Sequence, residues 1–139
     1  MEIEEAVRLI SESTNRITDT INIPLENAIG HILADDLYAD RPVPSFARSA
    51  MDGYAVCASD VSEACEGNPV KLRVSKEVLA GDDPGMVFAP QTAVRIMTGA
   101  MIPAGYDAVV RQEDTDYGEK EVLIYSPVSF HAYYCPVGE

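Results

Sequence analysis

The sequence of 139 residues has no tryptophan, two histidines and three cysteines. The cysteines (Cys57, Cys65 and Cys135) show no Cys-x-x-Cys spacing, and His31 and His131 supply no zinc-site pattern beside them. We therefore expect free thiols in a reducing compartment. The two histidines lie in dissimilar contexts, which argues against a nucleophile activated by a histidine base. The glycine patterns of P-loops and dinucleotide-binding folds are also missing.

Positive charge is scarce. Ten Lys and Arg residues face 23 Asp and Glu residues, which gives a net charge of −13. Because a nucleic-acid surface needs basic side chains to neutralise phosphate, we expect no nucleic-acid partner, and an anionic membrane is disfavoured for the same reason. No apolar run approaches the roughly 18 residues that span a bilayer. The acidic start, Met1–Glu5, lacks the basic and apolar regions of a signal peptide, so we expect a cytoplasmic protein.

The N-terminal third predicts one helix followed by mixed structure. Residues 2–16 carry apolar side chains at helical spacing, so we expect an amphipathic helix there. Pro24 opens a short helical turn that Gly30 can close. Residues 32–38 are typical of a strand. The two prolines in 41–44 exclude a central strand and predict a loop.

The remainder predicts a mostly β domain. We expect strands near 53–56, 70–79, 93–97, 108–112 and 121–125, with a hairpin turn at 117–120 between the last two. The strand at 93–97 is a candidate for an open sheet edge. Many short strands with Gly and Pro turns favour a small barrel or coiled sheet, so the predicted fold class is α+β, mostly β.

Two motifs place a polar residue before a glycine where a strand pattern meets a loop. Asp52 precedes Gly53, and Thr98 precedes Gly99. Loops at strand ends commonly carry binding and catalytic residues, because the strand fixes their position. A carboxylate such as Asp52 can bind Mg²⁺, and the Thr98 hydroxyl can donate or accept a hydrogen bond. The amides of Gly99 and Ala100 could meet an anionic ligand.

Structural explanations stand beside each of these functional ones. Asp52 and Thr98 fit two ordinary turns, with the aspartate capping its own turn. Residues 112–115 (Gln-Glu-Asp-Thr) offer another carboxylate pair, or a strand end that runs into an acidic turn. Arg48 and the pair Asp35-Asp36 fit a solvated surface.

The strings Ser-Ala-Met-Asp-Gly-Tyr at 49–54 and Ile-Met-Thr-Gly-Ala at 96–100 resemble motifs of the molybdopterin molybdenumtransferase family, which includes the C-terminal domain of gephyrin. Weaker similarity at 28–36 and 112–115 extends the resemblance over nearly the whole chain. Because members of that family are much longer, the resemblance implies an N-terminal region that lacks the following α/β domain. The segment before Gly138-Glu139 departs from many members, which carry arginines there.

The resemblance implies a fold of an N-terminal helix plus an elongated linker region with an inserted small coiled-sheet or barrel-like β domain. The expected boundaries are 1–44 for the helix and first linker segment, 45–126 for the β domain, and 127–139 for a truncated return linker.

The resemblance also implies a function. The intact enzyme would take adenylylated molybdopterin and molybdate, hydrolyse the adenylyl link with Mg²⁺, and release molybdenum cofactor and AMP at a homodimer interface. The site residues expected here are Asp52 and Thr98 as catalytic residues, Asp52 as metal ligand, and Ser49, Gly53, Gly99 and Ala100 as cofactor-binding residues. The isolated chain is expected to be inactive. The alternative is a non-enzymatic dimerisation or scaffold module.

Overall fold

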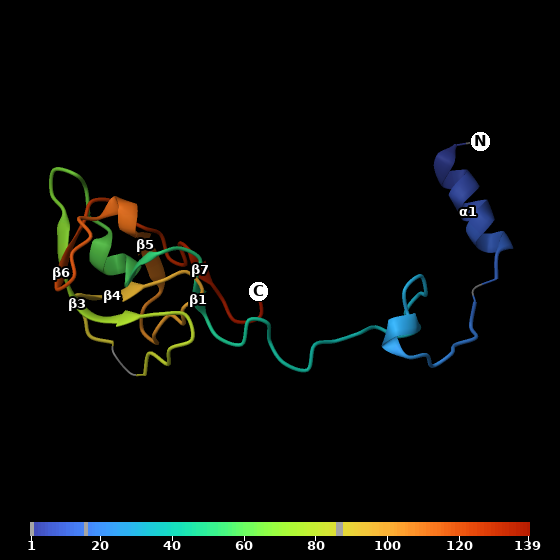
Figure 1. Cartoon of the computed structure of the whole chain (residues 1–139). Helices are drawn as coiled ribbons and strands as arrows, with labels where there is room; N and C mark the ends of the chain where they lie inside the picture. The colour runs from blue at the N-terminus through green and yellow to red at the C-terminus, as the bar shows by residue number, and fades with distance from the viewer. Residues whose placement is uncertain (1, 16, 86–87) are drawn as a thin grey trace. The chain divides into compact units, whose positions relative to one another are not determined.

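The computed structural model describes residues 2–15, 17–85 and 88–139. The chain divides into two compact units, one up to Tyr38 and one from Ala39 to Glu139 (Figure 1). Among the described residues, no helix is long and apolar enough to cross a membrane. Each unit is described by itself.

The first unit holds the helix α1 (Ile3–Ser13) and a 3-10 turn, η1 (Leu25–Asn27). The helix confirms the predicted one; Arg16, at the end of the predicted range, lies outside the described residues. The first turn of α1 is acidic, which suits the positive end of the helix dipole. No residue of α1 is buried within this unit, and the apolar side chains Ile3, Val7 and Ile10 are exposed.

The strand predicted at 32–38 was wrong. This segment has no strand structure, and Ile32 is 94% exposed. A strand needs a neighbour for its backbone hydrogen bonds, and none of the described strands pairs with this segment. The loop predicted at 41–44 is confirmed.

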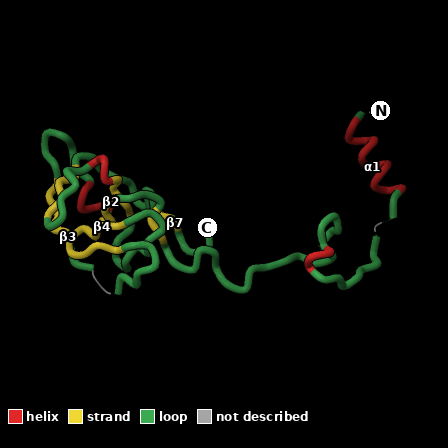
Figure 2. Tube along the Cα trace, viewed as in Figure 1, coloured by secondary structure: helices red, strands yellow, loops and turns green. Residues whose placement is uncertain are grey.

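The second unit is built on a curled, half-barrel sheet of five strands in the order β5-β2-β4-β3-β6 (Figures 1 and 2). Its strands are β2 (Gly53–Val56), β3 (Val70–Val78), β4 (Thr92–Ile96), β5 (Ala108–Arg111) and β6 (Glu121–Ile124). All pairings are antiparallel except that of β3 with β4. The register of β3 shifts between Val74 and Lys76, and such a bulge bends a strand and increases its twist. The predicted fold class, α+β and mostly β, is confirmed.

Both faces of this sheet are covered at β2, β4 and β5, because neighbouring residues of these strands enter two different apolar clusters. In β2, Tyr54 and Val56 belong to the first cluster and Ala55 to the second. The 3-10 helix η2 (Ala58–Val61) contributes Val61 to the first. The second cluster is completed from outside the sheet by Ala100, Ile102, Tyr106 and, at its margin, Tyr134. The central strands are therefore held rigidly from both sides.

A separate two-stranded ribbon joins β1 (Arg48–Ser49) to β7 (Tyr134–Cys135). It pairs Ser49 with Tyr134, which fixes the segment after β6 beside the Asp52 motif. The three cysteines are free, as predicted.

Two predictions about strand neighbours were wrong. The strands β5 and β6 lie at opposite edges of the sheet, so the turn at 117–120 is not a hairpin between them. Instead β6 folds back on the residues just before that turn, with Thr115 bridged to Ile124. The strand at 93–97 is not an open edge, because β4 lies between β2 and β3.

Candidate functional site

Asp52 lies directly before β2, and a close approach of two backbones fixes its position. Gly53 pairs with Ile96 on one side and with Arg111 on the other. A β-carbon at Gly53 would overlap the carbonyl oxygen of Val110. Only glycine allows β5 to come this close, so the residue before it is anchored to the sheet centre.

Thr98 follows the end of β4, the antiparallel neighbour of β2. In an antiparallel pair the end of one strand meets the start of the other, so the two motifs converge. Oδ1 of Asp52 accepts hydrogen bonds from the backbone N–H and from the hydroxyl of Thr98, both at 2.7 Å. The turn continues through Gly99 at φ +82°, a conformation that glycine adopts readily. The aspartate therefore caps the β4–β5 loop and not its own turn.

The environment of Asp52 favours its ionised form. The hydroxyl and then the amide of Thr98 lower the pKa of the Asp52 carboxyl; partial burial opposes them, and the positive charge of Arg95 makes the smallest contribution, which also lowers the pKa. Hydrogen bonds to a charged oxygen stabilise the charge. Both bonds fall on Oδ1, so among the described residues the second oxygen, Oδ2, has no partner. The Asp52–Thr98 pair therefore offers a ligand one negatively charged carboxylate oxygen, Oδ2 of Asp52.

The other expected site residues form the backbone frame behind this pair. The N–H of Gly99 donates to the backbone carbonyl of Ser49 at 2.8 Å, and the N–H of Ser49 donates to the backbone carbonyl of Ala100 at 3.0 Å. The Ser49 hydroxyl accepts from the N–H of Met51 at 3.2 Å. Ser49 and Ala100 are fully buried. The loop before Asp52 and the loop after Thr98 are thus bonded to each other.

The sequence-based idea that amides at 99 and 100 meet an anion is not supported by this geometry. The Gly99 N–H donates a hydrogen bond to the carbonyl of Ser49, and the Ala100 N–H donates one to the carbonyl of Met97 at 3.0 Å. A backbone N–H that already donates a hydrogen bond within the chain has no hydrogen left for a ligand. The Thr98 hydroxyl hydrogen is likewise donated to Asp52, so contact of this pair with an anion would have to come through a cation.

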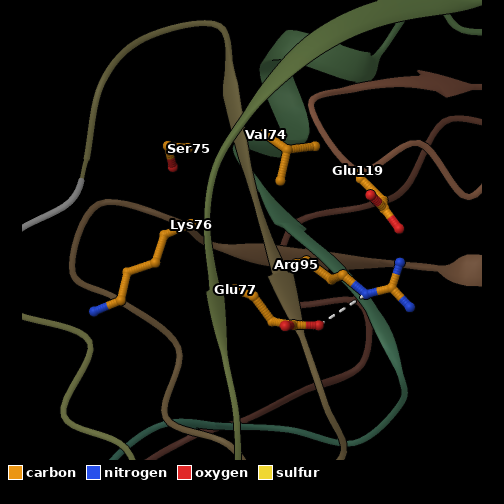
Figure 3. Close-up of a pocket in the computed structure, with 6 residues that line it drawn as sticks. All are labelled: Val74, Ser75, Lys76, Glu77, Arg95 and Glu119. Carbon is orange, nitrogen blue, oxygen red and sulfur yellow. Dashed lines mark ion pairs between the residues drawn. The ribbon is translucent and has the colours of Figure 1, made fainter.

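Arg95 is the functional candidate that the sequence analysis missed. Its guanidinium pairs with Glu77 at 3.1 Å and donates to the Tyr54 hydroxyl at 3.4 Å. It lines a hollow that Figure 3 shows, together with Val74, Ser75, Lys76, Glu77 and Glu119. Lys76 extends away from Arg95 there and donates to the carbonyl of Pro84. The one available signal was a charged residue inside the otherwise apolar stretch of β4.

The acidic turn at 112–115 has a structural explanation. Residues Gln112–Asp114 form a 3-10 helix, η3, after β5. Both carboxylate oxygens of Asp114 accept from the Arg111 guanidinium, at 2.9 and 3.0 Å. Such a two-point pair occupies the carboxylate. Within the described ranges there is no group of three or more His, Cys, Asp or Glu side chains that could hold a metal ion by themselves.

Comparisons with known proteins agree with the motifs. The family model described as MoeA N-terminal region (domain I and II) matches residues 1–139. Molybdopterin molybdenumtransferase 2 of Mycobacterium tuberculosis (strain ATCC 25618 / H37Rv) is 43% identical over 122 residues, which are 88% of this chain and 30% of that protein. Molybdopterin molybdenumtransferase of Bacillus subtilis (strain 168) is 42% identical over 118 residues, 85% of this chain and 27% of its own.

A solved structure gives the same result. The molybdopterin biosynthesis moeA protein of Pyrococcus horikoshii OT3 is 36% identical with a TM-score of 0.77, over 98% of this chain and 36% of that one. The chain thus spans well under half the length of each of these relatives.

Proposed function

Because the chain belongs to the molybdopterin molybdenumtransferase family, as its MoeA N-terminal region, we propose that it is part of an enzyme that inserts molybdate into adenylylated molybdopterin and releases AMP. The observation that carries this proposal is the Asp52–Thr98 pair, because the two motifs of the resemblance meet there in two hydrogen bonds. The pairing of β2 with β4 brings these loops together across 46 residues of sequence, and the pair then leaves one oxygen of a charged carboxylate without a partner among the described residues.

Asp52 is the proposed metal ligand. Mg²⁺ commonly takes one or two protein carboxylates and completes its shell with water and substrate phosphate. The free Oδ2 of an ionised Asp52 fits one such position, and the described residues place it in no group of three or more metal-binding side chains. When bound, Mg²⁺ would neutralise phosphate charge. This chain contributes the Asp52 carboxylate, which the two Thr98 donors keep ionised and hold in a fixed orientation.

Thr98 is the proposed partner in catalysis, and the four buried or backbone-bonded residues behind the pair keep it in place. Ser49, Gly53, Gly99 and Ala100 are proposed to belong to the ligand-binding loops through the backbone that they hold. A displacement of about 1 Å at a reacting group can cost on the order of a hundredfold in rate, so such a frame is part of the machinery.

The proposal has three further parts. The active enzyme is a homodimer, supported by the exposed apolar side chains of α1, which need a partner. It works in the cytoplasm, where free thiols such as these stay reduced. The isolated chain is proposed to have no activity, because it covers only 30% and 27% of the two curated relatives that it matches.

The test is molybdate-dependent release of AMP from adenylylated molybdopterin. We expect turnover from a protein that carries this chain at the full family length, and none from the 139-residue chain. Activity of the chain alone at the full-length rate would refute its dependence on further domains. A full-length protein without activity, but with bound substrate, would favour the scaffold alternative.

A further inference from the structure

Three aromatic rings in the segment between β6 and β7 form a continuous stack. Phe130 lies on His131 with ring centroids 3.9 Å apart and an interplanar angle of 18°. His131 lies on Tyr134 at 4.4 Å and 3°. Tyr134 packs at the margin of the second core cluster, whereas Phe130 is 66% exposed. The stack therefore starts at the core and ends in solvent. Because His131 covers one face of the Phe130 ring, the exposed area includes the other face.

The backbone under this stack is strained and firmly held. His131 and Tyr133 have φ of +61° and +52°, in the left-handed region that residues other than glycine rarely adopt. His131 donates its N–H to the carbonyl of Asp107 at 2.9 Å, and the carbonyl of Ala132 accepts from β5 at the same distance. Strained residues that the surrounding structure holds in place concentrate at ligand-binding sites.

The stack lies beside the Asp52 motif. Tyr134 pairs with Ser49 in the β1–β7 ribbon, and the carbonyl of Tyr133 accepts from the Ala50 N–H at 3.0 Å. The Arg111 guanidinium lies over the Tyr133 ring at 6.0 Å, and Arg111 itself pairs with Gly53. The aromatic segment and the Asp52 loop thus share one rigid frame.

We propose that the exposed face of Phe130 is a stacking platform for a planar nitrogen heterocycle, a purine or a pterin ring. The existing rings already show the parallel arrangement that a further planar ring would continue. Stacking on an aromatic side chain recognises any flat π system without needing particular hydrogen bonds. The choice of heterocycle rests on the proposed function, whose substrate carries both a purine and a pterin.

The test is a titration of the 139-residue chain, followed through the aromatic resonances of Phe130, His131 and Tyr134. The probes are AMP, a free pterin, and ribose 5-phosphate as the control without a ring. We expect millimolar AMP, pterin or both to shift the Phe130 resonances, and ribose 5-phosphate to leave them unchanged. A response to AMP alone identifies a purine platform, and a response to the pterin alone identifies a pterin platform.

Matched variants distinguish the effect of the aromatic ring of Phe130 from the effect of its apolar volume. Phe130→Leu keeps apolar volume but removes the stacking face, so we expect a loss of at least about fivefold in affinity for the responding probe. Phe130→Tyr should retain binding. Tyr38→Ala, which removes an exposed ring from the other unit, should change nothing.

The proposal is overturned if neither ring shifts the stack, or if Phe130→Leu binds as well as the unchanged chain. It is also overturned if Phe130→Leu abolishes self-association of the chain without affecting either probe, because Phe130 is then a contact between copies. Ring binding by the chain with an inactive full-length protein would refute only the proposed function. An active full-length protein without ring binding at Phe130 would refute only the platform.

Discussion

A single carboxylate oxygen, Oδ1 of Asp52, accepts both the backbone N–H and the side-chain hydroxyl of Thr98, each at 2.7 Å. Asp52 precedes β2 and Thr98 follows β4, so these two bonds join the two loops that carry the motifs of the family. One donor is the backbone N–H of Thr98, which every replacement of the side chain except proline keeps. The other can be removed by mutation, which makes the pair open to measurement.

Removal of the Thr98 hydroxyl should raise the pKa of Asp52. The hydroxyl is the largest cause of the lowered pKa, because it donates to the charged form. We expect Thr98→Val to bring the Asp52 pKa back toward its ordinary range and Thr98→Ser to keep it low. Titration of the carboxyl carbon by NMR measures both. An unchanged pKa in Thr98→Val would mean that the amide alone sets the charge.

The same pKa shift has a consequence for stability against pH. The pKa of Asp52 is lower in the folded chain than its ordinary value, so its stabilising effect is present above the ordinary pKa. It is lost as the pH falls through the lowered folded value. Urea midpoints for the unchanged chain and Thr98→Val should therefore differ at neutral pH and converge in acid. A difference that grows toward low pH would contradict this sign.

Replacement of Asp52 by alanine in a full-length protein should lower AMP release at least about tenfold, which corresponds to about 1.4 kcal/mol of transition-state stabilisation. The side chain is not part of either core cluster, so we expect the β domain to stay folded, with only the modest loss of stability that follows from two lost hydrogen bonds. Glu63→Ala removes an exposed carboxylate elsewhere and serves as the control. Near-normal turnover of Asp52→Ala would assign Asp52 to the loop structure alone.

Gly53→Ala should destabilise the chain by about 2 kcal/mol or more, because its β-carbon would overlap the Val110 carbonyl and force β2 and β5 apart. The matched control is Gly67→Ala, where a β-carbon meets nothing within 4 Å. Chemical denaturation of both variants measures the difference. Equal stability of the two would show that the strands can separate without cost, and would weaken the argument that Gly53 anchors the site.

The chain should self-associate through α1. Ile3, Val7 and Ile10 are all more than half exposed, and burial of such side chains gives about 25 cal/mol per Å². The net charge of −13 opposes association at low salt, so association should strengthen as salt screens it. Sedimentation equilibrium across a salt series measures this.

The control for self-association is a variant in which Val7 and Ile10 are replaced by glutamine, which should be weaker at every salt concentration. A chain that stays monomeric at millimolar concentration and at all salt concentrations would contradict the prediction.

Local patterns in the sequence were sufficient for much of the β domain. Runs of apolar and β-branched residues predicted β2 to β6 within a residue or two of their ends. The period of two in a strand also explains why Tyr54 and Ala55 enter opposite clusters. The helix at 3–13 followed from its apolar spacing, which acts within a few residues.

Strand neighbours were decided only by the tertiary structure. Sequential strands usually pair, which favoured a hairpin between β5 and β6, yet these two form the opposite edges of the sheet. The strand expected at 32–38 failed for a related reason, because an extended segment becomes a strand only when another strand accepts its hydrogen bonds.

The candidate site shows the same division. The sequence determined which residues carry the chemistry: an aspartate and a threonine, each before a glycine at a strand end. Only the antiparallel pairing of β2 with β4 brought Asp52 to Thr98, and only the close approach of β5 explains Gly53. The role of Arg95 and the use of the Gly99 amide also depended on that pairing. Covalent order fixes which groups are available, whereas long-range backbone hydrogen bonds decide which of them meet.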